Sequence, residues 1–198
     1  MPVQALFKPF QLGALQLSTR VVMAPMTRSF SPGGVPNSKV IEYYRRRAAA
    51  GVGLIITEGT VVGHQASNGY PNVPHFYGEA ALAGWKKVVD AVHAEGGKIV
   101  PQLWHVGSVR RIGTEPDASV PAYGPMEKLK DGNVVVHGMT AQDIKDVINA
   151  FAQAAKDAQS IGMDGVEIHG AHGYLVDQFF WEGSNQRTDE YGGSLANR

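Results

Sequence analysis

The stretch GVEIHGAHGY, residues 165–174, decides the fold of this chain and indicates its chemistry. Its apolar start predicts a buried strand over residues 164–169, and His169, His172 and Tyr174 lie at or just past the carboxyl end of that strand. Two imidazoles and a phenol can hold a polarised oxygen and deliver a proton beside it, which is acid catalysis on a carbonyl compound. Barrels of alternating strands and helices place their active sites at this end of their strands.

The rest of the chain alternates short apolar runs with amphipathic segments. The sequence predicts strands at 20–24, 53–57, 98–104 and 164–169, and helices at 38–50, 79–95 and 140–161. Asn37 or Ser38 can cap the first of these helices. Thr140, with Asp143 three residues later, gives the third helix a start that resembles a capping box.

Buried strands separated by helices indicate a parallel sheet with right-handed crossovers. A closed (β/α)8 barrel and an open doubly wound sheet both fit this order. Polar residues occur at one strand end after another, namely Thr27, Glu58-Gly59, Gln102 to His105, and His169, and this distribution favours the barrel. No GxGxxG motif follows the first strand, which weakens the dinucleotide-binding alternative.

The predicted fold class is therefore α/β, a TIM (β/α)8 barrel of which this chain supplies roughly the first four βα units. A complete barrel has ~250 residues, whereas this chain has 198. We expect residues 1–198 to form a single domain. Residues 107–138 are rich in glycine, proline and charge, and we expect them to form an excursion over the barrel mouth, with a strand at 134–136.

The composition narrows the function classes. The 18 basic residues balance 18 acidic ones, so nothing favours nucleic acid or an anionic membrane surface as a partner. The absence of cysteine removes disulfides, thiolate metal sites and cysteine nucleophiles. The N-terminus shows no secretory signal pattern, and no apolar run approaches the ~20 residues that a membrane-spanning helix needs. A soluble, cytoplasmic protein is the default expectation.

His169 and His172 allow three interpretations. They can be solvated or structural residues. They can ligate a metal, although a pair of histidines without a third ligand gives weak support for that. We favour the third interpretation, in which the rings hydrogen-bond an anionic or carbonyl oxygen. Tyr174 can be an ordinary core tyrosine, but its place after Gly173 favours a short turn that aims the phenol into the same pocket.

Thr27, Gln102 and Trp104 together describe a slot for a planar ring system. A hydroxyl can donate to a carbonyl group of a heterocycle, and an amide both donates and accepts, as the edge of a pyrimidine ring requires. An indole supplies a flat wall. Met26, just before Thr27, is by itself more typical of packing than of recognition.

Over nearly its whole length the chain resembles the Old Yellow Enzyme family, the FMN-dependent ene reductases. The motifs that carry the resemblance are LFKPFQLG, RVVMAPMTR, ITEGT, NGYPNVP, PQLWHVG, GVEIHGAHGYLVDQFF and SNQRTDEYGGSLANR. The last three, in this order, are highly specific. The resemblance implies a (β/α)8 barrel that holds FMN at the carboxyl ends of its strands.

The resemblance also implies a role for each matching position. Around the flavin it places Ala24, Pro25, Met26 and Thr27, with the Thr27 hydroxyl on the C4 carbonyl, and also Gly59 and Gln102. Around the substrate it places His169 and His172 on the carbonyl oxygen, Tyr174 as the proton donor, and Tyr70 and Trp104 as walls.

The reaction that the resemblance implies has two steps. NADPH or NADH reduces FMN. Flavin N5 then passes a hydride to the β-carbon of a small α,β-unsaturated carbonyl compound, while Tyr174 protonates the α-carbon.

Three positions and the length depart from the family pattern. His172 stands where other members have asparagine, His75 stands where a glycine commonly follows the proline, and Ser108 stands where many relatives have arginine. The sequence ends where the fourth helix of the family begins. We therefore expect the chain to be the N-terminal part of an ene reductase.

Two hypotheses compete with an ene reductase. One is an inactive or partner-requiring half-barrel that binds flavin, because four strands alone leave two unpaired edges, and such a half can pair with a second copy as a homo-oligomer. The other is a metal-dependent barrel lyase that uses His169 and His172.

Overall fold

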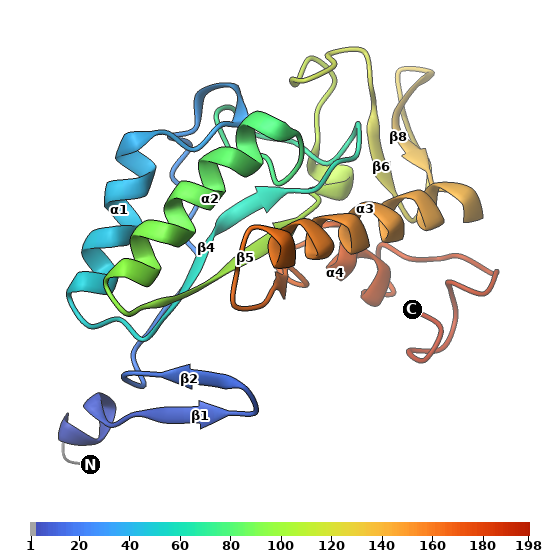
Figure 1. Ribbon diagram of the computed structural model, residues 1–198. Coiled ribbons are helices and arrows are strands. Elements are labelled where there is room, and N and C mark those ends of the chain that lie inside the picture. The colour runs from blue at the N-terminus through green and yellow to red at the C-terminus, as the bar shows by residue number, and fades with distance from the viewer. Residues whose placement is uncertain (1–2) are drawn as a thin grey trace. The chain divides into compact units, whose positions relative to one another are not determined.

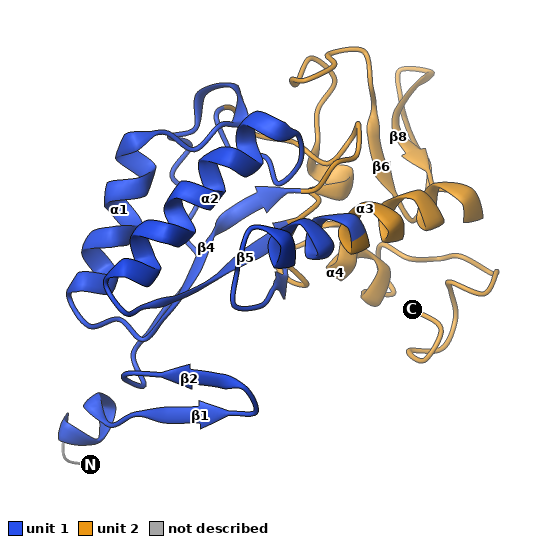
Figure 2. Ribbon diagram, viewed as in Figure 1, with its two compact units in different colours: residues 1–61, 72–103, 153–168 blue, residues 62–71, 104–152, 169–198 orange. Residues whose placement is uncertain are grey.

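The computed structural model describes residues 3–198 (Figure 1). These residues fall into two compact units (Figure 2). Unit 1 contains the chain up to residue 61, residues 72–103 and residues 153–168, and unit 2 contains residues 62–71, 104–152 and 169–198. The prediction of a single domain over 1–198 stays a prediction, and the two units are described separately below.

The main sheet has four strands in the order β3-β4-β5-β9, which is their order along the chain. The strands are β3 (Val22–Met23), β4 (Leu54–Val61), β5 (Lys98–Trp104) and β9 (Glu167–Ile168). β3 pairs with β4 in parallel, with Met23 opposite Ile55, and β5 pairs with β9 in parallel, with Gln102 opposite Glu167. Consecutive parallel neighbours joined by helices are the arrangement of a βα barrel.

Helices α1 (Ser38–Ala49) and α2 (Glu79–Ala94) pack against each other next to β4 in unit 1 (Figure 1). The Asn37 side chain caps α1 by accepting hydrogen bonds from the backbone N–H of Lys39 at 2.9 Å and of Val40 at 3.3 Å. α2 turns a fully buried face, which includes Trp85 and Val88, into the core of the unit. Both helices therefore begin where the sequence predicts.

Three strands differ from the prediction: β3 and β9 are shorter than predicted, and β4 is longer. β4 continues to Val61, so Glu58 and Gly59 lie inside a buried strand and do not follow a strand end. β4 has a neighbour on each side, which lets its ladder extend. β9 contains only Glu167 and Ile168, because it lies at the edge of the sheet and pairs on one side.

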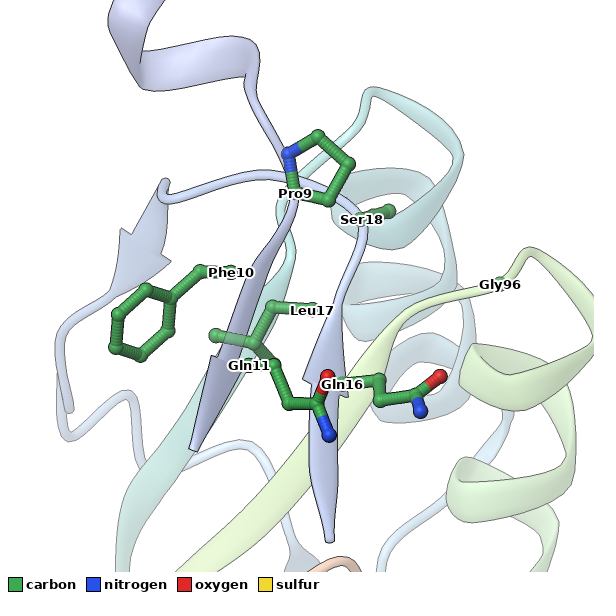
Figure 3. A pocket seen from close by; sticks show the side chains of 7 residues that line it. All are labelled: Pro9, Phe10, Gln11, Gln16, Leu17, Ser18 and Gly96. Carbon is green, nitrogen blue, oxygen red and sulfur yellow. The ribbon is translucent and has the colours of Figure 1, made fainter. Parts of the chain in front are cut away.

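The sequence did not predict the hairpin of β1 (Phe10–Leu12) and β2 (Leu15–Leu17), which follows a short 3-10 helix, Val3–Phe7. Gly13 has a left-handed backbone, with φ of 57°, in the turn that joins the two strands. Beside the hairpin lies a hollow of about 610 Å³ (Figure 3). It is lined by Pro9, Phe10, Gln11, Gln16, Leu17, Ser18 and Gly96. None of these seven side chains ionises, so the hollow offers no acid-base chemistry.

Unit 2 holds a small sheet in the order β6-β8-β7. Its strands are β6 (Ala122–Gly124), β7 (Lys128–Lys130) and β8 (Asn133–Gly138), and the last contains the predicted strand 134–136. A 3-10 helix, Gly107–Val109, lies next to β6. Residues 107–138 therefore contain a 3-10 helix and a three-stranded sheet. Their place over a barrel mouth stays a prediction.

Two helices complete the fold. α3 (Ala141–Ser160) begins with the predicted capping box: the Thr140 hydroxyl accepts from the Asp143 backbone at 3.2 Å, and the Asp143 carboxylate accepts from the Thr140 backbone at 2.7 Å. α4 (Leu175–Phe180) follows Tyr174. Within unit 2 the core consists of Met139, Ile144, Val147 and Leu175, with Tyr123, Phe151, Phe179 and Tyr191 packed against them. Among residues 3–198, no helix is both long and apolar enough to span a membrane.

Candidate active site

Five of the predicted site residues come together in unit 2. The ring of Tyr174 meets the rings of Trp104 and His169 edge-on, with centroids 4.9 Å away in each case. Trp104 and His169 are nearly parallel at 6.0 Å, and His172 meets His169 edge-on at 5.4 Å. Tyr70 stacks on Trp104 at 5.4 Å. We refer to Tyr70, Trp104, His169, His172 and Tyr174 as the aromatic cluster.

A strained turn presents His172 and Tyr174. His172 has a φ of 62° and Gly173 a φ of 74°, so two consecutive residues are left-handed. This backbone suits glycine but is uncommon for histidine, and strain of this kind is concentrated at functional sites. The Asp177 carboxylate accepts from the Gly173 backbone N–H at 2.7 Å, and the Gln178 amide donates to the Gly173 carbonyl at 2.6 Å. The start of α4 therefore holds the turn in place.

Hydrogen bonds from a buried loop hold Tyr70 in place. The Asn68 side chain accepts a hydrogen bond from the Tyr70 backbone N–H at 3.0 Å. Buried Arg110 donates to the Asn68 carbonyl at 2.5 Å. The hydroxyl of Tyr70 lies 3.0 Å from the hydroxyl of Tyr174, although 104 positions separate the two residues in sequence.

The polar atoms of the cluster suit a bound carbonyl compound. Burial raises the pKa of Tyr174 to about 12, so its phenol keeps its proton at neutral pH. The indole Nε1 of Trp104 is buried without a hydrogen-bond partner among residues 3–198. Buried donors in folded proteins usually have an acceptor, and a bound ligand that accepts from this N–H would supply it.

The predicted flavin residues all belong to unit 1. Ala24, Met26 and Thr27 are exposed in the segment that follows β3, and 49% of the Met26 surface is accessible. Gly59 is buried within β4, and Gln102 is buried near the end of β5. β3, β4 and β5 are adjacent in the sheet, so these positions lie on or just beyond neighbouring strands.

The chemistry of these residues fits a flavin. Thr27 offers an exposed hydroxyl beside the exposed apolar side chain of Met26. The Gln102 amide donates to the Glu167 carboxylate at 2.8 Å, which leaves its second N–H and its carbonyl oxygen for a pyrimidine edge. A ring system with apolar faces and polar edges requires this set of groups. The roles of these residues towards FMN stay predictions.

Sequence reasoning missed what Glu58 does. Glu58 is fully buried, and its carboxylate accepts from the Arg28 guanidinium at 2.7 Å and from the Arg28 backbone N–H at 3.2 Å. The Tyr44 hydroxyl accepts from the Glu58 backbone N–H at 2.9 Å, and burial raises the pKa of Tyr44. Glu58 thus fixes the residue that follows Thr27. An acidic residue in an otherwise apolar strand was the available signal.

A second pair that the sequence did not predict is formed by His64 and His105 in unit 2. The Gly107 backbone N–H donates to Nδ1 of His105 at 3.0 Å, so the ring proton of His105 must be on Nε2. Nε2 lies 3.0 Å from Nδ1 of His64 and donates to it. Burial lowers the pKa of His64 and lowers that of His105 much further, so both rings are neutral.

This pair predicts a loss of stability in acid. The unfolded histidines take up protons below pH about 6.5, while the folded ones resist protonation because their pKa is lowered. The free energy of unfolding should therefore fall as the pH drops below about 6.5, by at most ~1.4 kcal/mol per pH unit for each histidine that stays neutral in the folded chain. Urea unfolding at pH 7.5 and pH 5.5 measures this, and His105→Asn, which keeps an acceptor for Gly107, should reduce the pH dependence. An equal pH dependence in parent and variant would contradict the assignment.

A metal site is not among the features of the described chain. Within residues 3–198 no group of three or more His, Cys, Asp or Glu side chains is placed to hold a metal ion. His169 and His172 are the pair that a metal-dependent lyase would need. Their surroundings in the aromatic cluster are rings and a phenol.

Comparison with known proteins shows close relatives over the full described chain. The sequence is 44% identical over 205 residues to 12-oxophytodienoate reductase 7 of Oryza sativa subsp. japonica, covering 98% of this chain and 52% of the relative. It is 43% identical to flavin oxidoreductase hxnT of Emericella nidulans, covering 100% of this chain and 53% of the relative. This chain thus spans about half the length of the curated relatives that it matches.

A solved structure gives the same result. Morphinone reductase in complex with tetrahydroNAD superimposes with a TM-score of 0.89 at 39% identity, covering 98% of this chain and 56% of that one. The predicted fold, part of a (β/α)8 barrel, is thereby confirmed. The bound tetrahydroNAD belongs to the morphinone reductase structure, and the expected FMN and nicotinamide of this chain are proposals.

The family assignment rests on nearly the whole sequence. The sequence profile of the NADH:flavin oxidoreductase / NADH oxidase family matches residues 5–198. This match and the relatives above confirm the resemblance to the Old Yellow Enzymes. The chain belongs to the NADH:flavin oxidoreductase / NADH oxidase family.

Proposed function

We propose that the protein is an FMN-dependent ene reductase that reduces the C=C bond of small α,β-unsaturated carbonyl compounds. One observation carries the proposal: a phenol with a raised pKa stands edge-on to a histidine within a wall of aromatic rings. This arrangement suits protonation of a carbon next to a carbonyl group, because a weak acid keeps its proton until the substrate develops negative charge.

In this proposal the residues of unit 1 hold the flavin. The Thr27 hydroxyl donates to the C4 carbonyl, and the Gln102 amide bonds the pyrimidine edge. Ala24, Pro25 and Met26 line the ring, and Gly59 lets the ring approach the backbone. Bound FMN would supply the hydride chemistry that links oxidation of NADH or NADPH to reduction of the alkene.

The aromatic cluster of unit 2 holds the substrate. His169 and His172 donate hydrogen bonds to the carbonyl oxygen, which draws electron density away from the double bond. Trp104 and Tyr70 form walls for the flat conjugated system. Tyr174 gives its proton to the α-carbon. A histidine at 172 donates as an asparagine would, so the departure from the family pattern preserves the hydrogen bond.

A second candidate is a half-barrel that needs a partner segment before it binds flavin or turns over substrate. Its support is the exposure of apolar side chains on the two edge strands of the sheet, 48% for Val22 on β3 and 55% for Ile168 on β9. Unpaired parallel edges with apolar side chains invite pairing with another segment. The possible homo-oligomer and the cytoplasmic location stay predictions.

One experiment separates the two candidates. The purified chain is titrated with FMN, flavin fluorescence reports binding, and NADH or NADPH oxidation is then followed with 2-cyclohexenone as the alkene. The same measurements are made on a chimera in which this chain is continued by the C-terminal half of 12-oxophytodienoate reductase 7. Binding and turnover by the chain alone support the enzyme, and their appearance only in the chimera supports the partner-requiring half.

A pair of matched variants tests whether FMN binding depends on Thr27. Thr27→Val removes the proposed hydroxyl donor at nearly constant volume and should weaken FMN binding, whereas Ser160→Ala changes a hydroxyl at the end of α3 and should not. If neither the chain nor the chimera binds FMN or reduces the alkene, the proposed function is wrong.

A further inference from the structure

The hydroxyls of Tyr70 and Tyr174 form a direct polar contact within the aromatic cluster. They lie 3.0 Å apart, with the rings at 83° to each other and their centroids 6.5 Å apart. Two phenols at this distance share one hydrogen bond, and either oxygen can be the donor. A residue that lines the substrate pocket needs only its aromatic ring, so lining the pocket does not account for the hydroxyl of Tyr70.

We propose that Tyr70 is a second proton site, which donates to the Tyr174 oxygen as Tyr174 gives up its proton and then resupplies that proton. This inference rests on the proposed function, because it deepens the role of the same site. It gives Tyr70 an active part in the reaction besides that of a wall.

The direction of the hydrogen bond follows from the proton count. A phenol has one O–H, and when the Tyr174 O–H points at the substrate carbon its oxygen can only accept from Tyr70. As the O–H bond of Tyr174 breaks and the new C–H bond forms, negative charge develops on the Tyr174 oxygen. A hydrogen bond to a charged oxygen is roughly twice as strong as one between neutral groups. Tyr70 therefore stabilises the transition state more than the ground state.

The same contact returns the proton. The Tyr70 O–H bond breaks, a new O–H bond forms on Tyr174, and water then protonates the Tyr70 oxygen. The net reaction moves one proton from water to carbon, and no oxidant or reductant is needed. Tyr70 and Tyr174 are both only partly buried, so water can reach the pair.

The loop that carries Tyr70 is closely packed and held by hydrogen bonds. A Cβ at Gly69 would lie 2.8 Å from the Val106 side chain, so the backbone packs closely there. The backbone of Val106 donates to the Ser67 carbonyl at 3.0 Å, and the Ser67 hydroxyl donates to the Val62 carbonyl at 2.7 Å. Because the loop is fixed before substrate arrives, no reorganisation is needed to bring the hydroxyl to Tyr174.

The test measures the acidity of residue 174. A fluorinated tyrosine whose phenol ionises near neutral pH replaces Tyr174, so the titration is complete while the chain remains folded. We expect Tyr70→Phe to raise the pKa at position 174 by about one unit, because the phenolate loses a strong hydrogen bond and the neutral phenol loses a weak one. Fluorine NMR reads the shift, and circular dichroism checks that the fold is retained.

The controls isolate the hydroxyl of Tyr70. Tyr123→Phe removes another tyrosine hydroxyl of unit 2, which accepts from Gln65 at 2.7 Å, and should leave the pKa at 174 unchanged. His169, whose ring centroid is 4.9 Å from that of Tyr174, is present in every variant, so its effect on the phenol is the same in all of them. No change in the pKa, or a fall, in Tyr70→Phe would overturn the proposal.

A second measurement addresses turnover in the flavin-loaded protein. The rate of alkene reduction is followed in mixtures of light and heavy water. Two protons in motion give a curved dependence on the heavy-water fraction, and Tyr70→Phe should make it linear. A curve that is identical in parent and variant would speak against the relay. The titration requires neither flavin nor alkene. It therefore tests whether Tyr70 donates to the Tyr174 oxygen even if the proposed function is wrong.

Discussion

Tyr174→Phe is expected to slow alkene reduction by about 10²- to 10⁴-fold, the usual contribution of a positioned general acid. The substitution keeps the ring that meets Trp104 and His169 edge-on, so the shape of the pocket is preserved and only the proton is lost. Reduction of the bound flavin by NADH or NADPH uses no proton from this phenol. That half of the reaction should therefore keep its rate, and stopped-flow absorbance of the flavin measures the two halves separately.

Tyr123→Phe is the matched control for this prediction, because it deletes a hydroxyl from the same unit outside the aromatic cluster. Both halves of its reaction should run at the parent rate. Equal slowing of the two halves in Tyr174→Phe would show that the phenol supports the structure or the flavin, and its assignment as proton donor would be wrong.

The parts of the fold that the sequence predicts well are those set by local chemistry. α1 begins at an Asn37 cap, and α3 begins at the capping box of Thr140 and Asp143, because these contacts join residues two or three positions apart. Sequence motifs named the five residues of the aromatic cluster, which lie together in the structure, and their roles stay predictions. No local rule brings Tyr70 next to a residue 104 positions away.

The parts that the sequence did not predict depend on distant partners. The extent of β4 is set by neighbours on both of its sides, and this places Glu58 inside a strand, where local pattern put it at an end. The left-handed backbone of His172 contradicts the ordinary preference of histidine, and contacts from Asp177 and Gln178 to the adjacent Gly173 hold the turn. Tautomers such as those of the His64–His105 pair depend on a hydrogen-bond network that exists only in the folded chain.

Glu58→Gln is expected to produce the largest loss of stability, about 3 to 5 kcal/mol in the free energy of unfolding. Glutamine has the size of glutamate but no charge, so the Arg28 guanidinium, with 15% of its side chain exposed, is left without its counter-ion. The neighbouring ring of Tyr43, 3.5 Å from the guanidinium carbon, supplies only a weaker cation–π contact. Urea unfolding followed by circular dichroism measures the loss.

Two further variants show whether the loss comes from the buried charge. Glu95→Gln breaks an ion pair between Arg45 and Glu95 that is partly exposed on both sides, and it should cost far less, because water screens that pair. The double variant Glu58→Gln with Arg28→Met removes both charges and should recover much of the stability, since an apolar replacement leaves no unpaired ion. FMN binding should nevertheless stay weaker in the double variant, because the Arg28 backbone N–H, next to Thr27, donates to the Glu58 carboxylate, and an amide oxygen is a weaker acceptor than a carboxylate. Full recovery of stability together with unchanged FMN affinity would show that the pair serves the fold alone.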